Sequence, residues 1–335
     1  MKRTRAWVCG LIMAVALAVM PSQAFAATPW TRLGGDTAWD TMKLVVNEAY
    51  PTTSKYVIVA SGDGYWDALS ASGLAGCYDA PVVTTTGAAL KQQAKDVLTR
   101  LQPEHVFVMG GKSAISEDCL AQIKAACPSA TVERVAGATA ADTALEGYKK
   151  GTGSWGDTCI VATWNGYWDA LSIAPYAFAY KAPIFLVSGN NALSDGAVSA
   201  ITQNFEHVLV MGGTAVVPDA VVSTQLSGKK VTRLWGQNAM GTAVEAIKWE
   251  KANGMGSTHI TVATANDYYD ALAGAPLAGK SKSVIALVKE TDIQPLQEGW
   301  SFQPGETESG YILGGTAAVT DATFARMQAY EQGKA

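Results

Sequence analysis

The chain has 335 residues, of which 48% are hydrophobic and 16% are charged, and its formal net charge is −4. This composition is typical of a folded chain rather than a disordered one, and the negative balance lacks the basic footprint of a nucleic-acid binder. Three histidines leave little room for a His-rich metal site or for several Ser/His/Asp triads.

The first 26 residues have the three parts of a secretory signal peptide. Three basic residues open the chain, an apolar run follows at 6–20, and Ala24-Phe25-Ala26 matches the small-residue pattern of a cleavage site. The apolar run is short for a bilayer span of roughly 20 residues, which favours a cleaved signal over a membrane anchor. Cleavage after Ala26 removes three positive charges and leaves 22 Lys and Arg against 29 Asp and Glu. We therefore predict a secreted chain with a net charge of −7 and no later membrane span.

Export permits disulfide bonds, and the predicted mature chain holds four cysteines, Cys77, Cys119, Cys127 and Cys159. Cys119 and Cys127 lie roughly 12 Å apart along one predicted helix, so a bond between them is not expected while that helix holds. The other pairings stay open. The sequence contains no Cys-x-x-Cys or Cys/His spacing of the kind that zinc sites use.

After residue 29 the chain alternates short apolar strands with amphipathic helices. In chain order, the pattern predicts a strand at 30–33, a helix at 37–50, a strand at 56–60, a helix at 67–78, a strand at 82–85, a helix at 88–101, a strand at 105–109, and a helix capped by Ser116 that runs to about residue 126. The strands are continuously apolar and β-branched, which is typical of a parallel sheet covered on both faces. The predicted fold class is therefore α/β, with right-handed crossovers.

This pattern occurs three times. Three landmarks recur in the same order: an opening Arg, an Asp-Ala-Leu after the next strand, and a Gly-Gly after the last strand. They lie at Arg32, Arg134 and Arg233, at Asp67, Asp169 and Asp270, and at Gly110-Gly111, Gly212-Gly213 and Gly314-Gly315. The Gly-Gly pairs are 102 residues apart both times. We therefore predict three packed repeats, at 27–129, 130–229 and 230–335.

In each copy, one strand-to-helix turn collects polar residues. The three aspartates begin helices there, where an Asp side chain can cap backbone N–H groups. Alternatively, they contact a ligand or a cation, because binding crevices form where parallel strands end. Asp63, Asn165 and Asn266 precede them by four residues. Their oxygens suit sugar hydroxyls or a cation, although turn chemistry alone also explains them.

Aromatic and basic side chains provide two further sets of candidates. Tyr65, Tyr167, Tyr268 and Trp164 flank the turns, and flat rings with a polar edge suit the faces of pyranose sugars. The opening arginines either form salt bridges between repeats or grip an anionic group, since a guanidinium binds phosphate or carboxylate bidentately. The Gly-Gly pairs allow sharp turns and lack the pattern of a phosphate-binding loop.

The three copies resemble the cell wall-binding repeat 2 family of Gram-positive bacteria. The resemblance lies in the R-[LIV]-x-G-x₅-T opening, the D-A-L after the first strand and the V-[FLI]-V-x-G-G before the last helix, and it covers roughly residues 30–330. It implies Rossmann-like α/β repeats packed around a pseudo-three-fold axis. It further implies a secreted protein that anchors non-covalently to an anionic wall polysaccharide of the teichoic-acid type.

Catalytic motifs are missing from the sequence, since neither G-x-S-x-G nor H-E-x-x-H occurs. Three equivalent polar sites also suit multivalent binding better than a single catalytic centre. We therefore predict a binding protein of the cell wall or cell surface that is not an enzyme and uses no cofactor. Because the chain is acidic, local basic groups or a divalent cation would have to hold a polyanion. Two alternatives stay open, a self-assembling surface scaffold without glycan affinity and a wall hydrolase.

Overall fold

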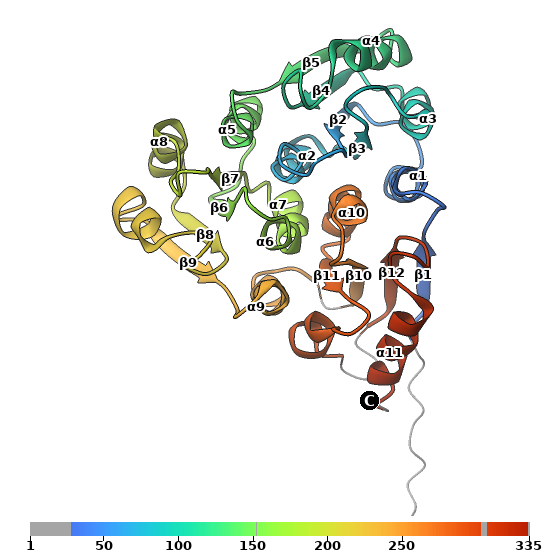
Figure 1. The fold of residues 1–335 in the computed structure, drawn as a ribbon, viewed down its shortest axis with the longest axis vertical. Coiled ribbons are helices and arrows are strands. Elements are labelled where there is room, and N and C mark those ends of the chain that lie inside the picture. Colours follow the sequence, from blue (N-terminus) through green and yellow to red (C-terminus); the bar gives the residue numbers. More distant parts are fainter. Residues whose placement is uncertain (1–27, 152, 257, 303–306, 334–335) are drawn as a thin grey trace, which may run out of the picture.

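Three α/β units form the structure, and each is built on a four-stranded sheet (Figure 1). The computed structural model describes residues 28–151, 153–256, 258–302 and 307–333, so the predicted signal peptide lies outside the described residues. Within the three sheets every strand pairing is parallel, which confirms the expected sheet type.

The first unit contains a sheet of strand order β3-β2-β4-β5. Its strands are β2 (Tyr56–Ser61), β3 (Val82–Thr85), β4 (His105–Met109) and β5 (Thr131–Val135). Its helices are α1 (Ala38–Ala49), α2 (Ala71–Tyr78), α3 (Gln92–Leu101) and α4 (Glu117–Ala126). The strands β3 and β4 have the bounds that the sequence predicts, and the Ser116 hydroxyl caps α4 by accepting the N–H of Cys119 at 3.1 Å.

The second and third units repeat this order as β7-β6-β8-β9 and β11-β10-β12-β1. The second unit contains α5 (Ala140–Lys150), β6 (Thr158–Thr163), α6 (Trp168–Ser172), α7 (Ala174–Ala179), β7 (Ile184–Val187), α8 (Asp195–Asn204), β8 (His207–Met211), the π-helix η1 (Val221–Gln225) and β9 (Lys230–Leu234). The third contains α9 (Ala239–Ala252), β10 (His259–Thr264), α10 (Tyr269–Lys280), β11 (Val284–Val288), the π-helix η2 (Pro295–Trp300), β12 (Ser309–Leu313), α11 (Asp321–Glu331) and β1 (Trp30–Leu33).

Each sheet takes its fourth strand from the opening landmark of another copy. The strands β5 and β9, which carry Arg134 and Arg233, pair with β4 and β8 of the preceding copy. The third sheet is completed by β1, in which Arg32 lies opposite Ile312 of β12. Figure 1 shows β1, in blue, beside the red β12. The three units therefore close into a ring, while the sequence division at residues 129 and 229 stays a prediction.

The helices α2, α7 and α10 meet at the centre of the ring and contact one another (Figure 1). Small residues permit this approach. A Cβ added to Gly76 of α2 would lie 2.1 Å from the carbonyl oxygen of Phe178, so no larger residue fits there without movement. This central packing gives the expected pseudo-three-fold arrangement.

Two helices of the first unit begin later than the sequence predicts. The chain forms a turn from Asp67 to Ser70, where the Ser70 hydroxyl donates to the Asp67 carbonyl at 3.3 Å, and α2 begins after it. Before α3, the Thr85 hydroxyl accepts the N–H of Lys91 at 2.8 Å and holds the preceding loop. Side chains that bond to the local backbone compete with helix formation in this way.

The four cysteines of the described chain are free thiols, so none of the pairings left open by the sequence is formed. All but Cys77 are buried. Among the described residues, no helix combines the length and the apolar character needed to cross a bilayer.

Candidate functional site

An aspartate from each copy lies at the boundary with the next unit. The carboxyl groups of Asp67, Asp169 and Asp270 lie against the first glycine of the Gly-Gly landmark in their own copy. A Cβ on Gly110, Gly212 or Gly314 would lie 2.6, 2.5 or 2.4 Å from the nearer carboxyl oxygen, and the three glycines have φ values of +101°, +96° and +103°. Only glycine therefore fits beside each aspartate without strain.

The next copy supplies a hydroxyl to each of these carboxyl groups. The hydroxyl of Thr143 lies close enough to Asp67 to favour its charged form, and Thr242 and Thr41 act in the same way on Asp169 and Asp270. The expected helix-capping role of the aspartates is wrong. The N-cap residues of α2, α6 and α10 are Ser70, Tyr167 and Tyr268, none of these helices has a side-chain cap, and the aspartates face the unit boundary instead.

Burial changes the acidity of these aspartates. It raises the pKa of Asp169 and of Asp270 to about 6, and that of Asp67 in the same direction, while the threonine hydroxyl opposes each change. The nearby charge of Asp267 raises the pKa of Asp270 further. Moreover, Oδ1 of Asp270 is buried and has no hydrogen-bond partner among the described residues. This boundary therefore presents an acceptor that a ligand donor would satisfy.

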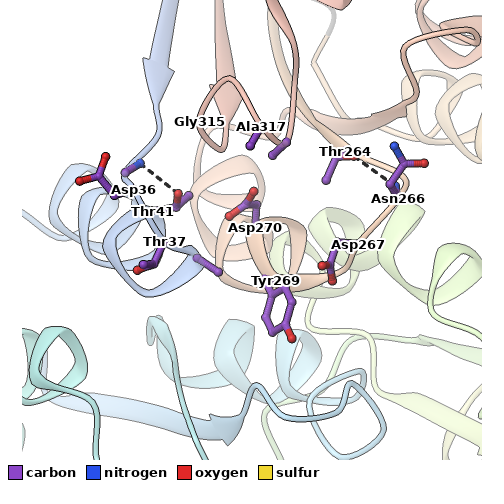
Figure 2. A pocket seen from close by; sticks show the side chains of 13 residues that line it. Asp36, Thr37, Thr41, Thr264, Asn266, Asp267, Tyr269, Asp270, Gly315 and Ala317 are labelled. Atoms are coloured by element: carbon purple, nitrogen blue, oxygen red, sulfur yellow. Dashed lines mark hydrogen bonds between the residues drawn. The ribbon is translucent and has the colours of Figure 1, made fainter.

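Pockets open beside Asp169 and Asp270. The pocket at Asp270, between the third and first units, has a volume of about 300 Å³, and the pocket at Asp169, between the second and third units, about 270 Å³. Figure 2 shows Asp270 between Thr41 on one side and Thr264, Asn266 and Asp267 on the other. The second pocket is lined by the matching residues Thr163, Asn165, Asp169 and Thr242. The same site is thus built twice from equivalent positions.

The predicted turn residues divide into two groups. Asn165 and Asn266 line the pockets, and their backbone N–H groups bond to the hydroxyls of Thr163 and Thr264 at 3.0 and 3.1 Å. Within the described part of the chain, neither side-chain amide forms a hydrogen bond. Asp63 instead accepts the N–H of Gly87 at 2.7 Å within its own unit. The first copy therefore departs from the other two at this position.

The predicted tyrosines lie on the pseudo-three-fold axis rather than in the pockets. The rings of Tyr65, Tyr167 and Tyr268 form a triangle in which each pair of centroids is 5.4 Å apart. The hydroxyl of Tyr268 donates to the carbonyl of Gly62 at 3.1 Å, which joins the third unit to the first. The three tyrosine side chains therefore hold the three units together at their centre. Trp164, which is 37% exposed, lies outside this triangle beside Gly189.

In the second and third copies, the aromatic residue that directly follows the predicted tyrosine reaches a pocket. Trp168 lines the pocket at Asp169, and Tyr269 lines the pocket at Asp270. The predicted site includes Tyr167 and Tyr268 but not the aromatic residue that follows each of them. The adjacent aspartate was the available signal, because Trp168 and Tyr269 directly precede the two pocket aspartates.

The opening arginines are bonded to the protein backbone. Nη1 of Arg32 donates to the carbonyls of Gly314 and Val319. In the same way, Nη1 of Arg134 and of Arg233 each donates to two carbonyls in the loop that begins with the Gly-Gly landmark. The donor distances range from 2.9 to 3.1 Å. Arg134 and Arg233 also approach Glu117 and Asp219, each of which is more than half exposed. These contacts fix the Gly-Gly loops, so the arginines are not included in the ligand set proposed below.

Comparison with known proteins gives one family. The model of cell wall binding domain 2 matches residues 32–120, 134–222 and 233–324. These three segments contain the three sets of landmarks and nearly all of the described secondary structure.

Two curated relatives come from Bacillus subtilis (strain 168). The N-acetylmuramoyl-L-alanine amidase LytC is 30% identical over 294 residues, which are 86% of this chain and 56% of that protein. The amidase enhancer is 28% identical over 262 residues, which are 78% of this chain and 35% of that protein. The chain therefore spans about half, or less, of the length of these relatives.

Two solved structures share the fold. Cwp6 and Cwp8 from Clostridium difficile superpose with TM-scores of 0.79 and 0.78, and each is 23% identical to this chain. The matches cover 86% and 91% of this chain and 46% and 52% of those chains.

Proposed function

Because the chain belongs to the cell wall binding domain 2 family, we propose that it is an exported protein that holds a wall glycopolymer in the pockets between its units. The observation that carries this proposal is the repetition of one pocket at two boundaries, each with an aspartate of raised pKa, a threonine from the next unit, an asparagine and an aromatic ring. A polymer repeats its own chemical unit, so one strand can occupy neighbouring pockets. Two weak contacts on one rigid frame then add through effective concentration.

The lining of the pockets suits sugar hydroxyls. The carboxyl of Asp270 and the side-chain amide of Asn266 supply acceptors and donors, and the ring of Tyr269 supplies an apolar face. A sugar hydroxyl that donates to Oδ1 of Asp270 would satisfy its unpartnered oxygen. We therefore propose that the polymer binds through its pyranose units.

An anionic polymer meets like charge at these pockets. Asp36, Asp267 and Asp270 all line the pocket between the third and first units. We propose that the anionic groups of the polymer lie outside the pockets or reach them through a divalent cation. Among the described residues, no group of three His, Cys, Asp or Glu side chains is arranged to hold a metal ion by itself. Such a cation would therefore need oxygens from the polymer.

We assign this chain binding rather than catalysis. The amidase names of the relatives belong to proteins of which this chain covers 56% and 35%. Hydrolases that act on glycosidic bonds place a pair of carboxyl groups across the bond, so a catalytic site built twice would need such a pair in both pockets. In the pocket at Asp169, that residue is the only carboxyl group among the described lining residues.

Sedimentation with purified cell walls tests the proposal. The protein should pellet with intact walls, and extraction of the secondary polymer should release most of it. A variant with Asn165→Ala and Tyr269→Ala, one change in each pocket, should pellet poorly, while the exposed change Gln203→Ala on α8 should not matter. Loss of binding on chelation, restored by calcium, would assign the cation.

Other outcomes would point to the other functions. Equal sedimentation with extracted walls would remove the polymer from the proposal. Release of soluble wall fragments that stops in a folded Asp169→Ala variant would instead indicate a hydrolase. Ordered oligomers of the pure protein in light scattering, without any affinity for walls, would favour a self-assembling scaffold.

A further inference from the structure

The third copy carries an exposed indole at a position where the other copies have small residues. Trp235 occupies the place of Gly34 and Ala136 in the opening landmark, and 55% of its surface is exposed. At the boundary between the third and first units, a Cβ on Gly34 would lie 2.4 Å from the carbonyl oxygen of Gly314, so no side chain fits there. The exposed ring is therefore a feature of one boundary alone.

A cleft of about 250 Å³ lies beside this indole. Its lining includes Trp235, Gln237, Asn238, Glu245, Gln294 and Glu298. Gln237 and Asn238 also line the pocket at Asp169, so the two hollows adjoin the same short loop. A glycan chain that fills the pocket at Asp169 could continue across this loop.

The wall of the cleft opposite Trp235 is formed by η2, the π-helix of the third unit. Where the first two units have α3 and α8, the third has η2, which is preceded by Gln294 and contains Glu298. The wall is rigid. Trp300 at the end of η2 is 2% exposed, and Gly299 packs against Ile247 of α9, where an added Cβ would lie 3.2 Å away.

The charges in this cleft select against an anion. Two carboxylates, Glu245 and Glu298, line it, and none of its described lining residues is Lys or Arg. Glu245 accepts a bond from Lys248 at 2.9 Å on the outer face of α9, whereas the side chain of Glu298 accepts, among the described residues, only an amide N–H from Gln294 at 3.0 Å. A ligand that brings a positive charge toward Glu298 is therefore favoured over phosphate.

We infer that this cleft is a second subsite, specific to the third copy, which binds an amino-sugar pyranose with a free amine. The sugar ring stacks on the exposed face of Trp235, its ammonium group approaches Glu298, and the amides of Gln237 and Gln294 bond its hydroxyls. The inference rests on the proposed function only for the source of the sugar, because the subsite itself can be tested with soluble oligosaccharides.

Calorimetric titration with β-1,4-linked glucosamine oligosaccharides tests the subsite. The protein should bind them, and Trp235→Ala should weaken binding about tenfold, since a stacked ring contributes up to about 1.4 kcal/mol. Leu44→Ala, which removes another exposed hydrophobic side chain on α1, should leave the affinity unchanged. Because Trp235 is exposed, its removal should also leave the melting temperature within about 2 °C of the parent value.

A second variant separates charge from stacking. Glu298→Gln keeps an acceptor for Gln294 and removes the charge, so it should abolish the preference for the free amine over the N-acetylated oligosaccharide. Equal binding of both sugars by the parent protein, an unchanged affinity in Trp235→Ala, or competition by inorganic phosphate would each overturn the inference. If the pocket variants lose wall sedimentation but still bind the oligosaccharide, the subsite at Trp235 is supported independently of the polymer pockets.

Discussion

Replacement of Asp169 by Asn should make the protein more stable at neutral pH. The pKa of Asp169 is about 6 in the folded protein and 3.8 ordinarily, and this difference corresponds to about 3 kcal/mol. Below pH 3.8 the carboxyl is protonated in both the folded and the unfolded chain, so it costs nothing. Between pH 3.8 and 6 the unfolded chain loses the proton first, and stability falls as pH rises. Above about pH 6 the full cost of about 3 kcal/mol is present.

Asparagine removes this cost because it cannot ionise. Its amide oxygen can still accept the hydroxyl of Thr242, while its NH₂ group adds a packing cost beside Gly212 that does not depend on pH. The difference between the free energies of unfolding of the variant and the parent should therefore be about 3 kcal/mol larger at pH 7 than at pH 3.5. Urea unfolding followed by tryptophan fluorescence measures both values.

The control is Asp195→Asn, an exposed aspartate in the first turn of α8. Its effect should stay below about 1 kcal/mol at either pH, which is the usual size of a helix-dipole contribution. If Asp169→Asn changes stability equally at pH 3.5 and pH 7, burial does not raise the pKa of Asp169 and the electrostatic account of the pocket is wrong. A stable variant that no longer binds walls would mark Asp169 as a residue kept for binding at the expense of stability.

Three further changes test other parts of the structure. Glu250→Gln should raise the melting temperature at pH 7 and not below pH 4.5, because Glu250 is fully buried on α9 and burial raises the pKa of its carboxyl well above 4.5. Calorimetry at both pH values measures this. Gly76→Ala should destabilise by about 1–3 kcal/mol through overpacking against Phe178, whereas Gly111→Ala, which meets nothing within 4 Å, should not; urea unfolding compares them. Arg134→Met should destabilise by about 1–3 kcal/mol because it removes bonds to two carbonyls and should leave wall sedimentation unchanged. If folded Arg134→Met sediments less with walls than the parent protein, Arg134 contacts the polymer after all.

The local elements could be predicted because local chemistry determines them. The apolar runs of β3 and β4 and the Ser116 cap of α4 depend on residues close together in the chain. The late start of α3 was missed, since the bond from Lys91 to the Thr85 hydroxyl reverses the preference of a segment with good helix formers. The fold class followed from strand composition and repetition together.

The sequence predicted some residues of the site but not their orientation. Spacing identified Asp169 and Asp270, but it could not show that their carboxyl groups face the next unit, because that depends on how the units dock. Successive residues at a helix start face different ways, and the pattern did not show whether Tyr167 or Trp168 reaches the pocket. Likewise, the sequence predicts the strand at 30–33 that carries Arg32, but it does not show which sheet that strand joins.

The pairing of β1 with β12 makes the third sheet mechanically unlike the other two. The polypeptide crosses every boundary between units, because β5, β9 and β1 each lead into the first helix of the next unit. In the third sheet, however, β1 comes from the opposite end of the chain to β12, and this seam is held by a short ladder, by bonds from Arg32 that span 282 and 287 residues, and by the N–H of Thr28 on Glu331 at 2.7 Å. A strand of polymer gripped by adjacent units pulls across such joints. Under load this seam should part first. The pocket at Asp270 is lined by Gly35, which follows β1, and by Gly315, which follows β12, so it would release the polymer before the pocket at Asp169 does.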